Sequence, residues 1–273
     1  MPLTKLQSHA LRILAAHRSP DSYIAGGVAI NRDGPRFSND IDIFQDSEDR
    51  MAAVADEDAA ALQRDGLKLT QGRKRPGKRE ILIEGLGEKM ALEWVVDSDY
   101  RFFPTLKDDA FGYVLHPVDL ATNKAAAAAD RREPRDIFDL VTVHETILPL
   151  GGVICAAVGR FPGVTPEEML AEITRHSRFT AGEFRVLATA QPIDPSALHQ
   201  KIRAMLEDAG KFIEKIRSED VGFVFLEGNT VVQPDLTRPG RYRRHAGARR
   251  GIWPTSPDIS SAMLEHYKTP AAD

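Results

Sequence analysis

The stretch Phe37-Ser38-Asn39-Asp40-Ile41-Asp42-Ile43-Phe44 decides how the first part of this 273-residue chain folds. Its apolar residues are typical of a strand, and alternation along a strand sends Asp40 and Asp42 to the same face. Two carboxylates on one face of a rigid strand repel each other unless a cation lies between them. Oxygen ligands of this kind suit Mg²⁺, which keeps water and substrate phosphates in its shell. A lone Asp-x-Asp is more often a solvent-facing strand end, so the prediction of a metal site depends on the neighbouring motifs.

A glycine pair, Gly26-Gly27, precedes this stretch and follows a short predicted strand, Tyr23-Ile24-Ala25. A brief helix is expected to begin at Val28, so the pair lies at a strand-to-helix turn. Glycine permits close approach to the backbone, and amide N–H groups beside a helix N-terminus bind anions. An isolated Gly-Gly would indicate an ordinary tight turn. Followed by Asp40 and Asp42, the pair predicts a triphosphate site next to a metal site.

A third carboxylate is expected from a neighbouring strand, and the stretch 90–97 offers Glu93 and Asp97 on the same alternation phase. Glu93 lies among apolar residues in the middle of that strand, where a charge is costly without a partner. Asp97 lies at the strand end, where Asp-Ser-Asp is more typical of a turn. We therefore favour Asp40, Asp42 and Glu93 as the catalytic and metal-binding acids.

The surrounding patterns predict an α+β fold in which a small mixed sheet is flanked by helices and followed by a mainly helical region. Periodicity predicts further strands over 67–70, 80–84 and 90–96, a basic turn over 72–78, and helices within 1–20 and over 51–66. Beyond Pro117, helices are expected over 118–131 and 134–147, after the capping sequence at Thr165, and from Asp194 to about 219.

This pattern divides the chain into three predicted parts. Residues 1–150 form the domain that carries the acids, and residues 151–220 form a helical domain. Residues 221–273 contain a hairpin over 221–232 and a basic tail, which is expected to be loosely ordered because it is rich in Pro, Gly and Arg.

Composition excludes several classes of protein. A net charge of −4 excludes a globally basic nucleic-acid binder but allows local basic patches. The single cysteine, Cys155, cannot form an internal disulfide and is expected to be buried. No apolar run approaches the roughly 20 residues that span a bilayer, and the N-terminal helix is amphipathic, unlike a signal peptide. We therefore predict a cytoplasmic protein without a membrane partner. Eight scattered histidines and one cysteine do not support a zinc or Ser-His-Asp site.

Four separated pieces of the chain resemble, in the same order, the DNA polymerase beta-like nucleotidyltransferase superfamily and, within it, the AbiEii/AbiGii toxin family. The pieces are Gly26-Gly27, the stretch 36–43, Pro117-Val118-Asp119-Leu120-Ala121-Thr122-Asn123-Lys124 with Arg131, and Pro134-Arg135-Asp136-Ile137-Phe138-Asp139-Leu140. The resemblance covers about residues 20–145. The predicted third acid is a glutamate in this chain, whereas the family pattern has an aspartate at that position.

The resemblance implies a nucleotidyltransferase fold and transfer of a nucleoside monophosphate (NMP) from an NTP to an acceptor hydroxyl, with release of pyrophosphate. It implies two Mg²⁺ ions, or Mn²⁺ in their place, bound by Asp40, Asp42 and Glu93. It also implies that Asp139 is structural and that the nucleotide is bound by Gly26, Gly27, Arg36, Ser38, Lys124, Arg135 and Asp136. From the residues alone, two interpretations of Lys124 stay open. It is either a solvated charge on an alanine-rich helix or, because such a helix packs closely on more than one face, a charge that points at a cleft.

Similar toxins add nucleotides to the 3′ end of tRNA, so the resemblance implies a tRNA acceptor, a cognate antitoxin and a toxin–antitoxin system of the phage-defence type. Two basic stretches are candidates for RNA binding: 73–79, and 238–250 with its six arginines. Either stretch alone is equally typical of a solvated loop or tail. Two other functions stay open, namely NMP transfer to a protein or antibiotic hydroxyl, and a catalytically silent nucleotide-binding regulatory module.

Overall fold

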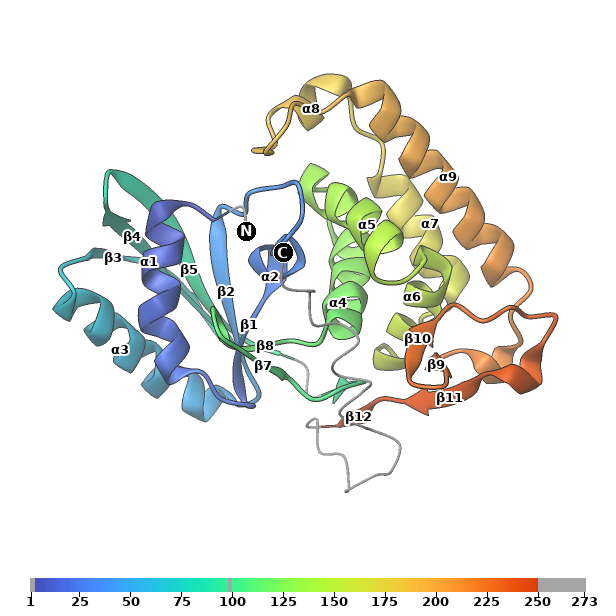
Figure 1. Cartoon of the computed structure of the whole chain (residues 1–273), viewed down its shortest axis with the longest axis horizontal. Coiled ribbons are helices and arrows are strands. Elements are labelled where there is room, and N and C mark those ends of the chain that lie inside the picture. Colours follow the sequence, from blue (N-terminus) through green and yellow to red (C-terminus); the bar gives the residue numbers. More distant parts are fainter. Residues whose placement is uncertain (1–2, 98–99, 250–273) are drawn as a thin grey trace. The chain divides into compact units, whose positions relative to one another are not determined.

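A computed structural model describes residues 3–97 and 100–249 of the chain (Figure 1). Its contacts divide the chain into two compact units. The first unit contains the described residues up to 97, together with 104–115 and 188–191. The second unit contains 100–103, 116–187 and the described residues from 192 onward. The helices over 117–146 therefore belong with the later helices, whereas the sequence-based division placed them in the first domain.

A seven-stranded mixed sheet forms the centre of the first unit, in the order β3-β4-β5-β2-β1-β8-β7. Its strands are β1 (Ser22–Ala25), β2 (Asp40–Gln45), β3 (Lys68–Arg75), β4 (Lys78–Gly85), β5 (Glu88–Val96), β7 (Leu106–Asp108) and β8 (Gly112–Val114). Strand β2 runs antiparallel to β1 and parallel to β5. The mixed sheet of the expected α+β fold is confirmed. Strands β7 and β8 were not predicted, because three residues are too few to show a period.

The predicted basic turn over 72–78 is wrong. Strand β3 continues through Arg75, and only Pro76 and Gly77 connect it to β4. Gly77 adopts a φ of +68°, which glycine tolerates in a tight turn. A β-bulge shifts the register between Gln71 and Lys74 and adds one residue to β3. The bulge interrupts the alternation of side chains, so the pattern did not indicate a strand there.

Helices α1 (Lys5–Leu14) and α3 (Glu48–Arg64) pack against one face of this sheet (Figure 1). Ile41 and Ile43 of β2 and Leu92 and Trp94 of β5 are fully buried. Because side chains alternate, the intervening residues of these strands, which include the predicted acids, point to the opposite face. The predicted N-terminal helix and the helix over 51–66 are thereby confirmed.

A buried ion cluster ties these helices to β5. Asp58 of α3 accepts hydrogen bonds from Arg18 Nη2 at 2.6 Å and from Trp94 Nε1 at 2.8 Å. The side chains of Arg18 and Asp58 are fully buried. Removing one partner of such a pair costs about 3–5 kcal/mol, because the other charge stays buried without compensation. Since Trp94 follows Glu93 in the chain, this cluster also fixes the strand that carries the predicted third acid.

The second unit is mainly helical. Its helices are α4 (Pro117–Asp130), α5 (Pro134–Thr146), α6 (Leu150–Ala157), α7 (Pro166–His176), α8 (Ala181–Arg185) and α9 (Pro195–Ile213). Thr165 and Glu168 form the predicted capping box of α7, and the Asp194 side chain caps α9. The predicted helices are confirmed, although α9 ends at Ile213 and not near 219. Helix α8 was not predicted, and α6 was recognised only as an apolar stretch.

The predicted hairpin over 221–232 is confirmed by β9 (Phe223–Glu227) and β10 (Thr230–Val232). The expected loose order of the tail is wrong for the described residues from 234 to 249. They include β11 (Arg243–Ala246), which pairs with β9, and β12 (Ala248–Arg249), which pairs with β6 (Tyr100–Arg101). The buried His245 Nε2 lies 2.7 Å from Phe102 O. The remainder of the tail, 250–273, lies outside the described residues.

Cys155 of α6 is 1% exposed, as predicted. Desolvation raises the pKa of its thiol to about 12. Within the described part of the chain, no single helix is both long and apolar enough to cross a bilayer.

Candidate active site

Strand β1 leads directly into the short helix α2 (Gly26–Ile30). The last residue of β1, Ala25, lies opposite Asp42 of β2. Gly26 has a φ of +66°, a backbone conformation that favours glycine. A Cβ atom on Gly26 would lie 1.8 Å from Asp42 Oδ2. The turn therefore requires glycine for two reasons, and its backbone lies against the carboxylate of the second aspartate.

The second glycine makes room for two polar side chains. A Cβ atom on Gly27 would lie 2.7 Å from Arg36 Nη2 and 2.8 Å from Ser38 Oγ. Ser38 Oγ donates a hydrogen bond of 2.7 Å to Asp40 Oδ1. Both Arg36 and Ser38 are buried. The structure thus brings together six of the predicted site residues, all in the first unit: Gly26, Gly27, Arg36, Ser38, Asp40 and Asp42.

The loop before β2 is held by two distant parts of the chain. Gln7 Nε2 of α1 donates to Ser38 O at 2.7 Å. Phe37 N donates to Ala188 O at 2.8 Å, and Ala190 N donates to Pro35 O at 2.8 Å. The segment 188–191 thus forms backbone hydrogen bonds with the loop that carries Arg36 and Ser38. The sequence did not indicate this pairing, because no local pattern relates residues so far apart.

Acidic side chains form a row across three neighbouring strands. Asp42 of β2 lies directly opposite Glu93 of β5, and Glu93 lies directly opposite Glu80 of β4. Residues directly opposite one another share a face of the sheet, so this row lies on the face away from α1 and α3. All three residues are half-buried. We did not identify Glu80 from the sequence, although its register with Glu93 follows once the two strands are paired.

Two of these acids have neighbours that fix them. Lys78 Nζ donates to Glu93 Oε2, and the two side chains form an ion pair. Glu80 Oε1 accepts a hydrogen bond from Arg73 N at 3.3 Å, and a Cβ atom on Gly72 would lie 2.6 Å from that oxygen. The bulge in β3 is therefore fitted around Glu80.

Asp97, the alternative third acid, lies just beyond the end of β5. It accepts a hydrogen bond of 3.0 Å from Tyr23 Oη. Glu93, by contrast, lies within β5 and is paired in register with Asp42. This register favours Glu93 over Asp97 as the acid that accompanies the aspartate pair.

The donor set on this face consists of carboxylate oxygens, which fit Mg²⁺ or Mn²⁺ better than a soft metal. Asp40 and Asp42 share a face, with Ser38 and Gly26 beside them, and Glu93 lies one strand away. Within residues 3–97 and 100–249, no three acidic, histidine or cysteine side chains already stand in the geometry of a metal site. The magnesium site stays a prediction.

Lys124 of α4 forms ion pairs with two fully buried carboxylates, Asp136 Oδ1 at 2.9 Å and Asp139 Oδ2 at 3.1 Å. Arg131 Nε lies 2.8 Å from Asp136 Oδ2. Burial opposes the charge on Lys124, but Asp139 and Asp136 more than offset it, so its pKa lies above the usual value. The structure therefore joins the third and fourth motifs through buried charges. The nucleotide-binding roles of Lys124, Asp136 and the half-buried Arg135 stay predictions.

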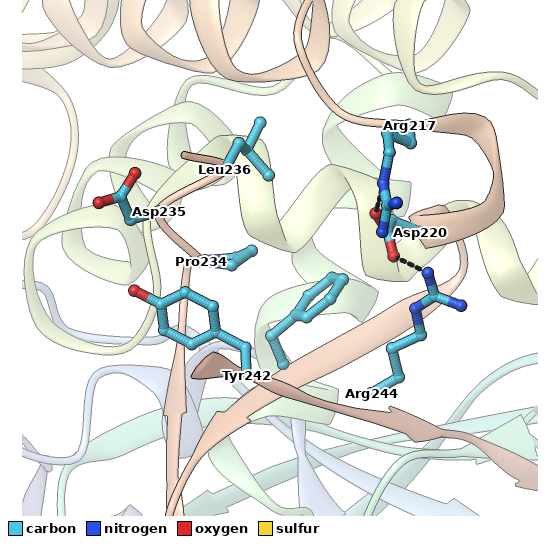
Figure 2. A pocket seen from close by; sticks show the side chains of 8 residues that line it. Arg217, Asp220, Pro234, Asp235, Leu236, Tyr242 and Arg244 are labelled. Carbon is cyan, nitrogen blue, oxygen red and sulfur yellow. Dashed lines mark hydrogen bonds and ion pairs between the residues drawn. The ribbon is translucent and has the colours of Figure 1, made fainter. Parts of the chain in front are cut away.

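The second unit also contains a pocket of about 340 Å³ (Figure 2). It is lined by Arg217, Asp220, Phe225, Pro234, Asp235, Leu236, Tyr242 and Arg244. Figure 2 shows the buried Asp220 between the two arginines. Arg217 Nε lies 2.8 Å from its carboxylate, and Arg244 Nη2 contacts the other oxygen. These two arginines are therefore part of a structural ion cluster.

The mixed sheet, with a glycine turn packed against an aspartate pair on the neighbouring strand, places the protein in the class of nucleotidyltransferases. The family model described as nucleotidyl transferase AbiEii toxin, type IV toxin–antitoxin system, matches residues 12–206. The chain belongs to this family, whose members are nucleotidyltransferase toxins.

A solved structure supports the assignment of the fold. MenT4, a nucleotidyltransferase toxin from Mycobacterium tuberculosis, aligns with a TM-score of 0.56 over 78% of this chain and 83% of its own, at 16% sequence identity. A comparison with curated protein sequences finds no significant match.

Proposed function

We propose that this protein transfers an NMP group from an NTP to an acceptor hydroxyl and releases pyrophosphate. The observation that carries the proposal is the contact between Gly26 and Asp42, because a phosphate-binding turn then lies against the strand of the aspartate pair. A metal-bound triphosphate needs these two features side by side.

Each site residue of the first unit has its own role in this reaction. The backbone N–H groups of the Gly26-Gly27 turn would bind the triphosphate. Arg36, buried beside Gly27, would neutralise part of its charge as pyrophosphate leaves. The Ser38 hydroxyl orients Asp40 through its hydrogen bond.

Asp40, Asp42 and Glu93 are the residues that would hold Mg²⁺ or Mn²⁺. When bound, the metal supplies charge neutralisation at the phosphates and lowers the pKa of the attacking hydroxyl. The ion pair with Lys78 fixes the Glu93 carboxylate in position. Lys124, Arg135 and Asp136 enter the proposal as nucleotide-binding residues on the resemblance of their motifs.

For the acceptor we take the 3′ end of tRNA in the cytoplasm, and for the partner a cognate antitoxin protein. The family supports the choice of an antitoxin, since its members are toxins of toxin–antitoxin systems. The choice of tRNA rests on the resemblance of the motifs.

The test uses labelled NTPs, supplied one at a time with Mg²⁺, Mn²⁺ or a chelator. Each NTP is incubated with total tRNA, with lysate protein and with aminoglycosides. We expect metal-dependent label at the 3′ end of tRNA. Label on protein or aminoglycoside alone would replace the RNA acceptor, and no turnover of any NTP would favour a catalytically silent module.

A further inference from the structure

The β3–β4 hairpin carries five basic residues in the range 73–79, and the strand register sets four of them against each other. Lys74 lies directly opposite Arg79, and Arg75 lies directly opposite Lys78. Like charges directly opposite in an antiparallel pair are destabilising. A two-residue turn joins the strands, so the cations cannot move far apart. An anionic ligand would offset this repulsion.

The hairpin compensates only part of this charge itself. Lys78 pairs with Glu93, and Arg79 Nη1 lies 2.6 Å from Asp56 Oδ1. Arg73, Lys74 and Arg75 are exposed, and none of them has an ion-pair partner in the described part of the chain. They lie on β3, which is an edge strand of the sheet. Residues directly opposite one another share a face, so Lys74 lies with Arg79 on the face of α1 and α3, whereas Arg75 lies with Lys78 on the face of the acid row. Arg73 lies at the bulge against Glu80. Two uncompensated positive charges, Arg73 and Arg75, are therefore placed beside the acid row.

The arginine-rich tail differs in this respect. Arg238 lies 3.7 Å from Asp235, Arg241 pairs with Glu227, and Arg244 contacts the buried Asp220. These three arginines of the tail are therefore paired within the second unit. The cations of the hairpin at 73–75 have no such pairs in the described part of the chain, so they are available to a ligand.

The hairpin also lies in line with the candidate active site. The bulge at Gly72 and Arg73 packs on Glu80, and Glu80, Glu93 and Asp42 are consecutive partners across the sheet. Three strand spacings of about 4.8 Å separate β3 from β2 by about 14 Å. Successive phosphates of a nucleic-acid strand are spaced by about 3.4 Å along the helix axis. A strand whose terminal hydroxyl lies at Asp42 would thus place the phosphate about four nucleotides before that end at the hairpin.

We propose that Arg73 and Arg75 bind the phosphodiester backbone of the RNA acceptor close to its reacting 3′ end. The identity of the ligand as RNA rests on the proposed function. The hairpin holds the acceptor strand in register with the acid row, whereas Arg238, Arg241 and Arg244 of the tail form ion pairs within the second unit.

The test measures binding of fluorescein-labelled tRNA to the full chain between about 50 and 200 mM salt. The variant replaces the two cations beside the acid row, Arg73→Ser with Arg75→Ser. Each phosphate contact contributes about 0.7–0.9 to the slope of log affinity against log salt, so the slope should fall by about 1.4–1.8. Affinity at the lower salt concentration should fall about tenfold or more.

The matched control removes the same charge from the tail, as Arg238→Ser with Arg241→Ser. Its slope should equal that of the wild type. Thermal unfolding checks both proteins, and the hairpin variant should unfold at the wild-type temperature or above it, because like-charge repulsion is relieved. A hairpin variant with wild-type slope and affinity would overturn the proposal, as would a tail variant that alone loses binding.

Measuring binding separately from transfer distinguishes this proposal from the proposed function. If tRNA binding depends on the hairpin but no NMP transfer occurs, the proposed binding surface is supported and the proposed reaction is refuted. If the hairpin variant transfers NMP to tRNA at the wild-type rate, the proposed reaction is supported and the proposed binding surface is refuted. Wild-type protein that binds no tRNA would also refute the surface.

Discussion

The acids of the first unit and the acids of the second unit lie on regular elements, but their surroundings differ. Asp40 and Asp42 are half-buried on one face of the sheet, and Glu93 lies directly opposite Asp42 on the neighbouring strand. Asp136 and Asp139 are fully buried and lie within 3.1 Å of Lys124. A half-buried row of acids beside a glycine turn is typical of a ligand site, whereas opposite charges buried together hold helices in place. Substitutions in the two regions should therefore separate activity from stability.

The largest expected effect is that of Asp42→Asn. Removing one charge of the aspartate pair should lower the rate of NMP transfer by about a thousandfold or more, because the proposed metal loses a ligand. The free energy of unfolding should change much less than the rate, because Asp42 is only half-buried. Initial rates with labelled NTP and thermal unfolding measure the two quantities.

Glu57→Gln is the control for Asp42→Asn, because Glu57 is exposed on α3 and its replacement changes the net charge equally. It should leave the rate unchanged. Transfer at the wild-type rate by the Asp42 variant would remove the acid pair from the mechanism.

Lys124→Met should show the opposite behaviour. It leaves Asp136 and Asp139 buried without their shared cation, which should lower the free energy of unfolding by about 3–5 kcal/mol. Urea unfolding monitored by circular dichroism measures the loss. Adding Asp139→Asn to this variant should recover part of it, because one uncompensated charge is removed.

If Lys124 serves mainly to bind phosphates, Lys124→Met would instead weaken NTP binding and leave stability unchanged. That result would make the second unit's acids resemble those of the first, and the contrast between the two regions would fail.

The sequence predicted those parts of the site that depend on patterns among residues close together in the chain. Alternation placed Asp40 and Asp42 on one face, and the position of Gly26-Gly27 after an apolar strand predicted the turn. The pairing of the acid row with Glu80 depends on strand order and register, which no local pattern specifies. A bulge at Gly72 concealed the hairpin, and hydrogen bonds from 188–191 to the Arg36 loop join residues too distant to be recognised from spacing.

Gly26→Ala should have a smaller effect than the loss of a charge. Alanine at a positive φ costs about 1–3 kcal/mol of stability, and its Cβ would also displace the Asp42 carboxylate. Both stability and transfer should therefore fall. Gly66→Ala is the matched control, because Gly66 has a φ of +85° and nothing lies within 4 Å of its Cβ position.

Gly66→Ala should lower the free energy of unfolding but leave the rate of NMP transfer unchanged. Equal activity of the two alanine variants would show that the contact between the turn and Asp42 is not needed for transfer, and would separate the glycine turn from the acid pair.

Two buried groups of the second unit should show the smallest effects, because their contributions oppose each other. Burial raises the pKa of Asp119 to about 7, although it accepts hydrogen bonds from Phe102 N and Phe103 N. Its contribution to stability is complete below about pH 4 and is lost as the pH rises to 7. Burial, with a smaller effect of His245, lowers the pKa of His116 to about 3. Its contribution is complete above pH 6.5 and is lost as the pH falls towards 3.

Between about pH 4 and 6.5 the two slopes have opposite signs, each at most about 1.4 kcal/mol per pH unit. His116→Asn keeps an acceptor for the N-terminus of α4 and should leave a free energy of unfolding that falls as the pH rises. Asp119→Asn should leave one that rises with pH over the same range. Urea unfolding at several pH values measures both variants against the flatter profile of the wild type. Parallel profiles in all three proteins would show that these groups do not titrate as buried residues, and that burial of ionisable groups does not distinguish the second unit from the half-buried acid row.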